Sequence, residues 1–336
     1  MPMKIAVDAM GGDFAPREVV KGALAVAREL PELHIVLVGH EDAVLAALDG
    51  QGAIPATVTI KHSSQVIEMT EHPAQAMRRK RDSSLVVSGL MVRNGEADAT
   101  FSAGSTGAAM AIATLDIGRI PGIERPALAT GIPTAQGRAL LLDAGANVDC
   151  SPKNLMQFAL LGAIYAERAM GIENPRIGLL NIGSEATKGN ELAKEVYQRL
   201  NTTALNFYGN VEGKDVFEHA VDVVVCDGFA GNVLIKSGEG MAEMVFDLLQ
   251  REIDADPHIV ESLDVFAPIF KRLIQRVHYS EFGGAQLLGV NGVSVIGHGR
   301  SDAKAIAGGI RAAVAGAASG YVDAIRDALP AFEGKA

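Results

Sequence analysis

Residues 101–108 read Phe-Ser-Ala-Gly-Ser-Thr-Gly-Ala and lead from a short apolar run into a helical pattern. The run Ala99–Ser102 is typical of a buried strand, and Thr106–Ile117 has the periodicity of a helix. Ser105 suits the N-cap of that helix, while the flanking glycines would let backbone N–H groups approach an anion. A strand, a glycine loop and a helix in this order are the repeating unit of α/β proteins.

The same alternation of apolar runs and helical patterns continues in both directions along the chain. Further strands are predicted at Lys4–Asp8, His34–Val38, Thr57–Lys61, Ala127–Gly131, Ala139–Asp143, Arg176–Asn181, Val221–Cys226 and Val293–Ile296. Further helices are predicted at Arg17–Leu30, Pro152–Met170, Glu191–Leu200, Asn232–Ile253, Pro257–His278 and Asp302–Leu329. Because no low-complexity linker separates these elements, we predict a single α/β domain over residues 1–336.

Two places depart from simple alternation. Between Ile120 and Asp143, two strand-like runs are joined through Pro133-Thr134-Ala135-Gln136-Gly137, which predicts an antiparallel hairpin and therefore a mixed sheet. Two long helical patterns then follow each other over residues 232–280, with only Asp254-Ala255-Asp256-Pro257 between them. This second pattern predicts a helical hairpin that projects from the sheet.

Composition excludes several classes of protein. The 30 Lys and Arg against 40 Asp and Glu give a net charge of −10, which argues against a general affinity for nucleic acid. Cys150 and Cys226 are too few for a disulfide framework or a four-ligand zinc site, and the eight His are isolated, so we expect no metal and inert thiols. No run approaches 18 apolar residues, and the expected compartment is the cytoplasm.

Glycines and polar residues gather where the predicted strands end. In open α/β sheets ligands bind at the carboxyl ends of strands, so several such loops would converge on one anion site. Taken singly, Asp143-Ala144-Gly145-Ala146-Asn147 is more typical of a turn than of a catalytic loop. No loop has the spacing of a Walker A motif, and no Gly-x-Gly-x-x-Gly follows the first strand, so a nicotinamide dehydrogenase has no support.

The basic run Arg78-Arg79-Lys80-Arg81 stands out on this acidic chain. It is either a solvated helix end, where cations complement the helix dipole, or a docking site for an acidic carrier or another anion. Ser83 and Ser84 would then open the next helix.

Six ordered motifs together resemble the PlsX phosphate acyltransferases of bacterial phospholipid synthesis, from about residue 3 to about residue 315. They are Asp8-Ala9-Met10-Gly11-Gly12-Asp13, the 102–108 loop, Asp143-x-Gly145-Ala146-Asn147, Asn181-Ile182-Gly183 with Lys188-Gly189-Asn190, Asp227-Gly228-Phe229-x-Gly231-Asn232, and residues 282–292 with Asn291. The chain departs from the family pattern at Ser105, Gln286 and Arg300.

The resemblance implies that acyl-[acyl carrier protein] and inorganic phosphate give acyl phosphate and free carrier protein, without a cofactor. It also implies a homodimer with a three-layer α/β/α mixed sheet similar to that of isocitrate and isopropylmalate dehydrogenases. The predicted catalytic residues are Asp8, Ser105, Thr106, Asn147 and Lys188. The predicted substrate-binding residues are Gly11, Gly12, Asp13, Gly104, Gly107, Asn181, Gly183, Asn190, Asn232 and Asn291, with the run Arg78–Arg81 as the carrier docking site.

The chemistry agrees with this interpretation. A thioester already has a good leaving group, so transfer to phosphate needs a held dianion, donors for the tetrahedral oxyanion and exclusion of water, but neither a metal nor a covalent intermediate. Two alternatives remain open at this point. One is a phosphotransacetylase that acts on acyl-CoA, and the other is a non-catalytic anion-binding scaffold at the membrane.

The segment after Pro257 carries one more pattern. Apolar residues at 259, 263, 266, 270, 273 and 277 form a single helical stripe, which suits a dimer interface. Its tip, with Ile259, Val260 and Leu263, is a candidate for reversible contact with the inner face of the membrane, because the product must reach a membrane enzyme, expected to be a glycerol-3-phosphate acyltransferase.

Overall fold

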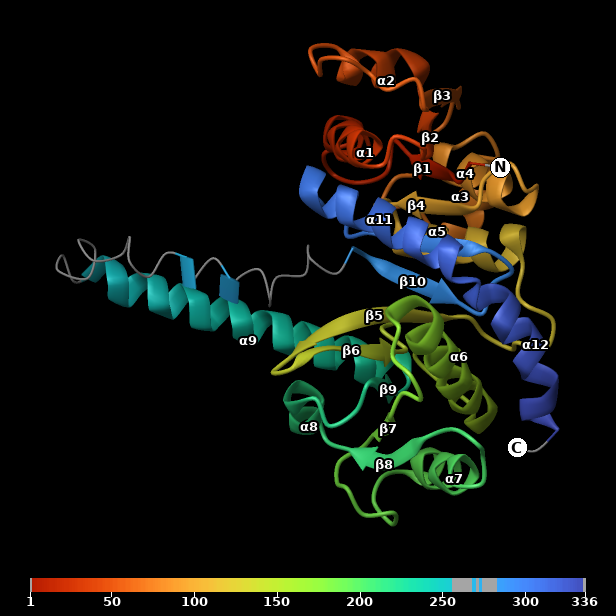
Figure 1. The fold of residues 1–336 in the computed structure, drawn as a ribbon, viewed down its shortest axis with the longest axis vertical. Helices are drawn as coiled ribbons and strands as arrows, with labels where there is room; N and C mark the ends of the chain where they lie inside the picture. Colours follow the sequence, from red (N-terminus) through yellow and green to blue (C-terminus); the bar gives the residue numbers. More distant parts are fainter. Residues whose placement is uncertain (1, 256–267, 270–271, 274–282, 335–336) are drawn as a thin grey trace.

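The computed structural model describes residues 2–255, 268–269, 272–273 and 283–334. Their strands form one 11-stranded sheet in the order β3-β2-β1-β4-β11-β10-β5-β6-β9-β7-β8 (Figure 1). The strands are β1 Lys4–Asp8, β2 His34–Gly39, β3 Val58–His62, β4 Ala99–Ser102, β5 Ala127–Thr134, β6 Gly137–Leu142, β7 Ile177–Leu180, β8 Phe207–Val211, β9 Val223–Val225, β10 Ala285–Leu288 and β11 Val293–Ile296.

The sheet reverses its direction in the middle. β3, β2, β1, β4 and β11 are parallel to their neighbours and form a first parallel set. β6, β9, β7 and β8 form a second parallel set. Between the sets, β10 is antiparallel to β11 and to β5, and β5 is antiparallel to β6. These three reversals leave the two sets running in opposite directions, so their carboxyl ends point away from each other.

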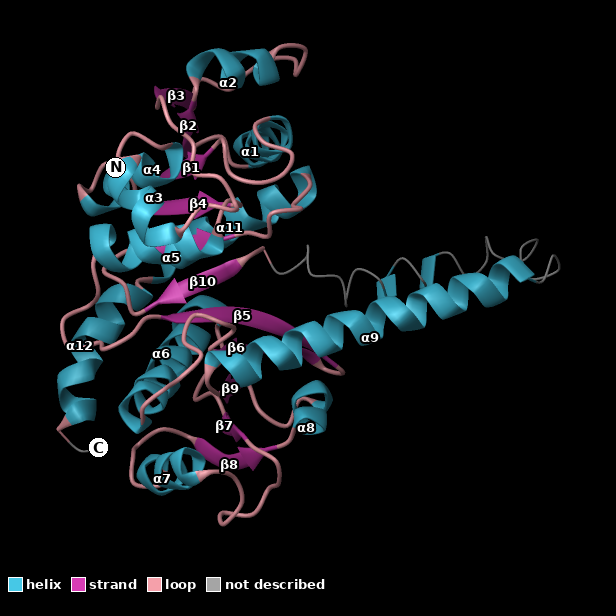
Figure 2. Ribbon diagram, turned by 180° about the vertical axis from the view of Figure 1, so that it is seen from behind, coloured by secondary structure: helices cyan, strands magenta, loops and turns pink. Residues whose placement is uncertain are grey.

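Helices cover both faces of the sheet (Figures 1 and 2). They are α1 Arg17–Glu29, α2 Glu41–Leu48, α3 Pro73–Arg79, α4 Ser84–Arg93, α5 Thr106–Ile112 with the π-helical turn η1 Ala113–Ile117, α6 Pro152–Met170, α7 Glu191–Leu200, α8 Gly213–Glu218, α9 Gly228–Ala255, α11 Ala303–Ser319 and α12 Tyr321–Glu333. Strand β1 shows the division between faces: Ile5 and Val7 join the buried cluster of α1 and α11, whereas Ala6 joins Met91 of α4.

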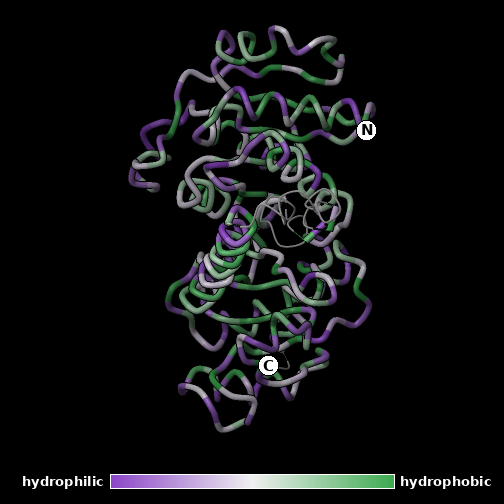
Figure 3. The backbone as a smooth tube through the Cα atoms, turned by 90° about the vertical axis from the view of Figure 1, so that its left-hand side faces the viewer, coloured by the Kyte–Doolittle hydropathy of each residue, from purple (hydrophilic) through white to green (hydrophobic). Residues whose placement is uncertain are grey.

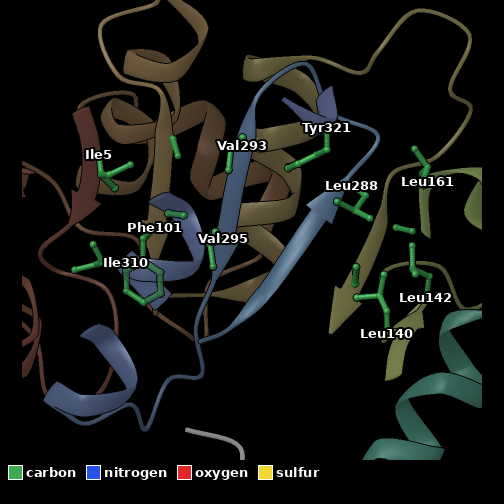
Figure 4. Close-up of a cluster of buried hydrophobic side chains, with 14 of the residues drawn as sticks. Ile5, Phe101, Leu140, Leu142, Leu161, Leu288, Val293, Val295, Ile310 and Tyr321 are labelled. Carbon is green, nitrogen blue, oxygen red and sulfur yellow. The ribbon is translucent and has the colours of Figure 1, made fainter. Parts of the chain in front are cut away.

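The main cluster of buried apolar side chains crosses the reversal in the sheet (Figure 4). Phe101 of β4 and Ile310 of α11 belong to it, and so do Leu142 of β6 and Leu161 of α6. The two parallel sets therefore share one core, whose burial supplies the main favourable term in folding.

The predicted mixed α/β fold is confirmed, including the antiparallel pair β5 and β6. That hairpin turns more tightly than expected, because the strands continue to Thr134 and restart at Gly137. Strands β8 and β10 were not predicted. β8 contains Gly209 and Asn210, which are poor strand formers, and β10 lies within a glycine-rich stretch.

Two predicted helices differ most from the structure. The helix expected from Asn232 begins at Gly228, and it continues through Asp254 to Ala255. The helix expected over Asp302–Leu329 is two helices, because Gly320 adopts a left-handed conformation with φ of +67° that ends α11 and precedes α12. No single described helix is both long and apolar enough to cross a bilayer. Among the described helices, only the pair α11 and α12 together has the required length and apolarity, and the two helices meet at a bend of 52°.

Helix α9 projects away from the body of the molecule (Figure 2). Figure 3, in which this helix points toward the viewer, shows polar and apolar residues interleaved along it. The second helix of the predicted hairpin falls mostly outside the described residues, as do Ile259, Val260 and Leu263.

Candidate functional site

Three loops of the first parallel set bind one another at the carboxyl ends of β1, β4 and β11. Ser102 Oγ donates a hydrogen bond to Asp8 Oδ2 at 2.7 Å and accepts one from the Gly104 N–H at 3.0 Å. The Gly297 N–H donates to the Ser102 carbonyl at 2.8 Å, and the Asp13 N–H donates to the Gly299 carbonyl at 2.8 Å. These bonds fix the three loops as a unit, which we call the first loop cluster.

Gly11 is required by the closeness of these loops. A Cβ atom at this position would lie 2.5 Å from Asp8 Oδ2 and 2.7 Å from the Gly104 nitrogen. Any side chain would therefore push the turn after β1 away from the turn after β4. The sequence-predicted residues Asp8, Gly11 and Gly104 meet at this point, with Gly12 and Asp13 beside them.

Asp8 organises the first loop cluster from within. Its side chain is buried at 2% exposure, and its Oδ1 accepts from the Met10 N–H at 3.2 Å. Burial raises the pKa of this carboxyl, although hydrogen bonds from Ser102 and Ser84 and from backbone N–H groups oppose the shift. The Asp8 carboxylate therefore accepts its hydrogen bonds from the neighbouring loops and not from solvent.

A cavity of about 1250 Å³ lies beside the first loop cluster. One wall is apolar and comes mainly from β5 and α9; it includes Leu128, Ile132, Pro133, Leu234, Ile235, Met241, Ala242, Val245 and Phe246. The loops after β1, β4 and β11 add polar residues to the lining, namely Asp13, Thr106, His298, Arg300 and Ser301, and further polar residues come from β5 and α9. Large apolar cavities with a few convergent polar groups are typical of ligand sites.

Charged groups lie around His298; Asp13, Glu239 and Arg300 line the cavity with it, whereas Lys236 does not. Lys236 and Glu239 come from α9, where they form an ion pair of 2.8 Å, and Arg300 and Asp13 come from the first loop cluster. Although the His298 side chain is exposed overall, partial burial of its ring and then the cations of Lys236 and Arg300 lower its pKa, against the opposing effect of Glu239 and Asp13. The imidazole is therefore neutral at pH 7.

Ser105 and Thr106 occupy different environments. Ser105 is buried, and its Oγ accepts from the Ala108 N–H at 3.4 Å as the predicted N-cap of α5. Thr106 is exposed and lines the cavity. Gly107 packs against Pro73 of α3.

A second loop cluster follows β6 and β9. Asp143 is fully buried, and its carboxylate accepts from the N–H groups of Leu128, Gly145, Ala146 and Asn147 at 2.6–3.2 Å. The Asn147 side-chain amide donates to Asp143 Oδ2 and to the Pro126 carbonyl, both at 2.8 Å. Asn232 packs against Gly145. The Asn147 amide is therefore engaged within the protein.

The loop after β7 carries a third group of predicted residues. Asn181 donates to the Lys188 carbonyl at 3.2 Å, and Asn190 caps α7 by accepting from the Ala193 N–H at 2.9 Å. Lys188 Nζ lies 4.0 Å from Glu185 Oε1, and its side chain is half exposed. Gly183 packs against both of these ion-pair partners.

Of the loops predicted to converge, the structure brings together those after β1, β4 and β11 but not those after β6 and β7, because the sheet reverses its direction. The loops after β6 and β7 belong to the second parallel set, and none of Asn147, Lys188, Asn181, Asn190 and Asn232 lines the cavity. Asn291 lies in the turn before β11, where its Oδ1 accepts from Arg326 at 2.5 Å, far along the strand from the first loop cluster.

Sequence reasoning missed the loop 297–301. The signal was present, since Gly297-His298-Gly299-Arg300-Ser301 lies between a predicted strand and a helix capped by Asp302, whose Oδ1 accepts from the Ala305 N–H. The cavity wall on α9 was also missed, because an apolar helix face gives no sign in sequence of what it covers.

Comparison with known proteins agrees with this architecture. Residues 3–323 match the model of a family described as "Fatty acid synthesis protein". A phosphate acyltransferase from Desulfitobacterium hafniense is 51% identical over 331 residues, which cover 98% of each chain. The chain belongs to the phosphate acyltransferase family.

Solved structures show how widely this family's fold is shared. A phosphotransacetylase from Streptococcus pyogenes matches with a TM-score of 0.64 at 19% identity, over 94% of both chains. A 4-hydroxythreonine-4-phosphate dehydrogenase from Klebsiella pneumoniae matches with a TM-score of 0.56 at 12% identity, over 94% of this chain and all of the other. The predicted likeness to a dehydrogenase-type α/β fold is therefore confirmed.

In this phosphate acyltransferase family member, the basic run divides into two parts. Arg78 and Arg79 are exposed at the end of α3. Lys80 donates to Glu71 at 2.6 Å and to the Val66 carbonyl at 2.7 Å, and Arg81 makes a two-pronged contact with Asp116 at 2.8 and 3.1 Å. Half of the predicted docking run thus holds neighbouring segments together.

Both cysteines are held as thiols. Burial, followed by the charges of Asp143 and Asp227, raises the pKa of Cys150 to about 12. Cys226 is buried beside the same carboxylates, and its pKa is raised as well. Because the thiolate is the nucleophilic form, neither side chain is prepared for covalent catalysis.

Proposed function

We propose that this protein transfers an acyl group from acyl-[acyl carrier protein] to inorganic phosphate, which yields acyl phosphate and free carrier protein. The observation that carries the proposal is the cavity of about 1250 Å³, whose apolar wall suits an acyl chain and whose polar lining suits the reacting groups. Family membership supports an acyltransferase, and the cavity supports a long acyl substrate.

The reaction balances without a further reactant. A phosphate oxygen forms a bond to the thioester carbonyl carbon, and the carbon–sulfur bond breaks with its electron pair on sulfur. The carrier thiolate then takes up the proton that the phosphate gives up to solvent. Because a thiolate leaves readily, the protein's main tasks are positioning, stabilisation of the oxyanion and exclusion of water.

The first loop cluster supplies groups for these tasks. Thr106 and Arg300 line the cavity, where the hydroxyl of one and the guanidinium of the other would contact the phosphate. Asp8 would act through Ser102 and Gly104, by keeping the loops in place. Binding of phosphate by Lys188 and a catalytic role for Ser105 and Asn147 stay predictions from the sequence.

The proposal includes the docking of an acidic carrier protein and an association with the membrane. Acyl carrier protein is acidic, so an enzyme with a net charge of −10 needs a local basic patch to attract it, and exposed Arg78 and Arg79 provide one. The acyl phosphate would pass to a membrane glycerol-3-phosphate acyltransferase, which favours a cytoplasmic enzyme held at the inner face of the membrane.

A homodimer is also proposed. Val233, Met241, Met244 and Leu248 of the projecting helix α9 are each about half exposed. An apolar face of this size on a protruding helix is typical of an association surface. A second copy of the chain would cover it and shorten the exposed length of the helix.

One assay tests the function. The purified protein is incubated with phosphate and long-chain acyl-[acyl carrier protein], acyl-CoA or no acyl donor, and acyl phosphate is trapped as a hydroxamate. We expect product from the carrier thioester at a kcat/KM at least tenfold above that from acyl-CoA. Preference for acyl-CoA would make the protein a phosphotransacylase, and product from neither would leave an anion-binding scaffold.

A further inference from the structure

We propose that Phe217 limits the length of the acyl chain that this protein accepts, because it forms the cavity wall on the far side from the first loop cluster. This inference rests on the proposed function, since it concerns the acyl chain of that reaction. It is carried by the contact between α8 and α9, by the anchoring of α8, and by the place of Phe217 in the cavity lining.

Helix α8 packs against the base of α9 (Figure 1). A Cβ atom at Gly238 of α9 would lie 3.1 Å from Cζ of Phe217 and 3.4 Å from its Cε1. A Cβ atom at Gly213 of α8 would lie 3.5 Å from Cδ1 of Leu234. The partners on each helix are four residues apart and therefore share one face of it. The tip of the Phe217 ring reaches the backbone of α9 because residue 238 has no side chain.

The cavity-lining residues of α9 form two adjacent stripes at helical spacing. One stripe is Leu234, Gly238, Met241 and Val245, and the other is Ile235, Glu239, Ala242 and Phe246. The first stripe begins at the contact with α8. The second contains Glu239, whose charge acts on His298 of the first loop cluster. Helix α8 and the first loop cluster therefore bound the cavity on different sides of α9.

The backbone around Phe217 is held by the neighbouring elements. The Phe217 carbonyl accepts a hydrogen bond from the Ala135 N–H at the tip of the β5–β6 hairpin, at 2.8 Å. Val216 is fully buried in an apolar cluster with Leu141 of β6 and Val224 of β9. The ring is therefore carried by a backbone that cannot easily retreat from a longer acyl chain.

His219 fixes the end of α8. Its φ of +67° is one that residues with a Cβ atom seldom adopt. Its Nδ1 lies 3.0 Å from Thr134 Oγ1, its Nε2 lies 3.4 Å from Asp222 Oδ1, and its carbonyl accepts from Arg176 at 3.3 Å. Arg176 also makes a two-pronged contact with Asp222 at 3.0 and 3.1 Å. These contacts tie α8 to the hairpin and to the strand entrance at Arg176.

The wall at Phe217 suits the methyl end of an acyl chain. Phe217 is 37% exposed and lines the cavity beside Pro133 and Ala135 of the hairpin, so part of its ring surface is open to an apolar ligand. The thioester would lie at the polar loops on the other side. A chain too long for this distance must leave methylenes in water, and each one reduces binding about fourfold.

The dependence of the reaction on chain length tests this inference. We would measure kcat/KM with phosphate and acyl-carrier thioesters of 8 to 22 carbons and take as the limit the longest chain that retains a tenth of the maximal value. Phe217→Ala should raise kcat/KM at least tenfold for a chain two carbons beyond the wild-type limit, with a change below threefold at 8 carbons. Phe217→Leu, which keeps an apolar side chain against α9, should extend the limit in the same direction.

Gly238→Ala should shorten the limit. The new Cβ atom would be too close to the Phe217 ring, which must then move away from α9 into the cavity. We expect kcat/KM at the limiting length to fall at least fourfold relative to 8 carbons, the effect of about one methylene. In a Phe217→Ala background this loss should disappear, because the two positions are coupled through the ring.

Gly240→Ala is the matched control, since a Cβ atom at that position of the same helix would meet no atom within 4 Å among the residues that the structure describes. Its length profile should be within twofold of wild type. Circular dichroism and the thermal midpoint confirm folding of every variant.

Two results would overturn this inference alone, in a wild type that makes acyl phosphate. One is an unchanged limit in both Phe217 variants, and the other is an equal loss at all chain lengths, which would make the ring only a support of the fold. If the wild type makes no acyl phosphate from either thioester, the proposed function fails and the role of Phe217 fails with it.

Discussion

Ser102 Oγ and Asp8 Oδ2 are joined by a 2.7 Å hydrogen bond that ties the end of β4 to the end of β1. The contact is buried, and the carboxyl lies among turns where a charged group loses its hydration. The first loop cluster is thus organised around a side chain that costs stability at neutral pH. Such a cost is common where a site needs a fixed geometry.

Asp8→Asn should change how stability depends on pH. A carboxyl whose pKa is higher in the folded chain than in the unfolded chain binds its proton more tightly when the chain is folded. Its contribution to the free energy of unfolding is therefore greatest at low pH and falls as the pH rises above 3.8, the ordinary pKa of an Asp carboxyl. The free energy of unfolding of wild type minus that of the variant should therefore decrease between pH 4 and pH 8, as measured by urea denaturation.

Glu29→Gln provides a control of opposite sign. Hydrogen bonding to Arg311 lowers the pKa of the Glu29 carboxyl, so its contribution is present above the ordinary value of 4.5 and is lost on acidification. The free energy of unfolding of wild type minus that of Glu29→Gln should therefore rise with pH. A flat difference for Asp8→Asn beside a rising one for Glu29→Gln would contradict the effect assigned to burial of Asp8.

Lys188→Ala tests the phosphate contact predicted from the sequence. The long 4.0 Å ion pair with Glu185 leaves the ammonium available to an anion, so we expect a tenfold or larger rise in phosphate KM or fall in kcat. Arg300→Ala, which removes a cation from the cavity lining, is the matched variant. Near-normal kinetics for Lys188→Ala with a raised phosphate KM for Arg300→Ala would place the phosphate at the first loop cluster alone.

Reversing the charge of Arg78 and Arg79 together should weaken the encounter with acyl carrier protein. We expect the KM for the acyl-carrier substrate to rise and its salt dependence to flatten, with the phosphate KM unchanged, because the patch acts by long-range attraction. Lys80 and Arg81 are left intact, since their contacts with Glu71 and Asp116 hold the fold.

The control for this charge reversal is Arg168→Glu with Arg199→Glu, which makes the same change in net charge on α6 and α7. An equal rise in carrier KM for both pairs would mean that net charge, and not the end of α3, governs docking. A change in phosphate KM alone would move the Arg78 and Arg79 pair to the inner site.

Ala242→Phe should shorten the acyl chains that the protein accepts. Ala242 faces the cavity, and a phenyl ring there would occupy space along the apolar wall. Each methylene of the acyl chain that can no longer be buried loses about 0.8 kcal/mol of favourable transfer free energy. The kcat/KM for a 16-carbon acyl chain should therefore fall at least tenfold more than that for a 6-carbon chain. Exposed Glu243, which is outside the lining, provides the control Glu243→Phe; equal losses for both variants would argue against an acyl site here.

Leu263→Glu tests the membrane contact predicted from the sequence pattern after Pro257. A charge at the tip should abolish co-sedimentation with anionic liposomes, because interfacial binding depends on buried apolar area. Size-exclusion chromatography and the acyl phosphate assay should show an active dimer. Loss of the dimer would assign Leu263 to the subunit interface, and unchanged sedimentation would remove the tip from the membrane contact.

Local patterns in the sequence predicted most elements of this fold but not their relative direction. The helices Pro152–Met170 and Glu191–Leu200 have the predicted boundaries, because their caps Ser151 and Asn190 are local signals. The antiparallel placement of β10 depends on its pairing with β5, which lies more than a hundred residues earlier in the chain and which no local pattern records. For that reason the sequence alone groups the loops holding Asn147 and Lys188 with those holding Asp8 and Thr106.

The position of β10 and β11 also bears on how the chain folds as it is synthesised. β4 and β5 do not pair with each other; the sheet between them is completed by residues 285–288 and 293–296, which are synthesised after every other strand that the structure describes. Until then, the nascent protein has two partial sheets, each with an unpaired edge that can bind another chain. Closure requires contacts distant in sequence, which form slowly. A truncation that removes the last fifty residues would therefore leave both edges open and should yield an aggregating product.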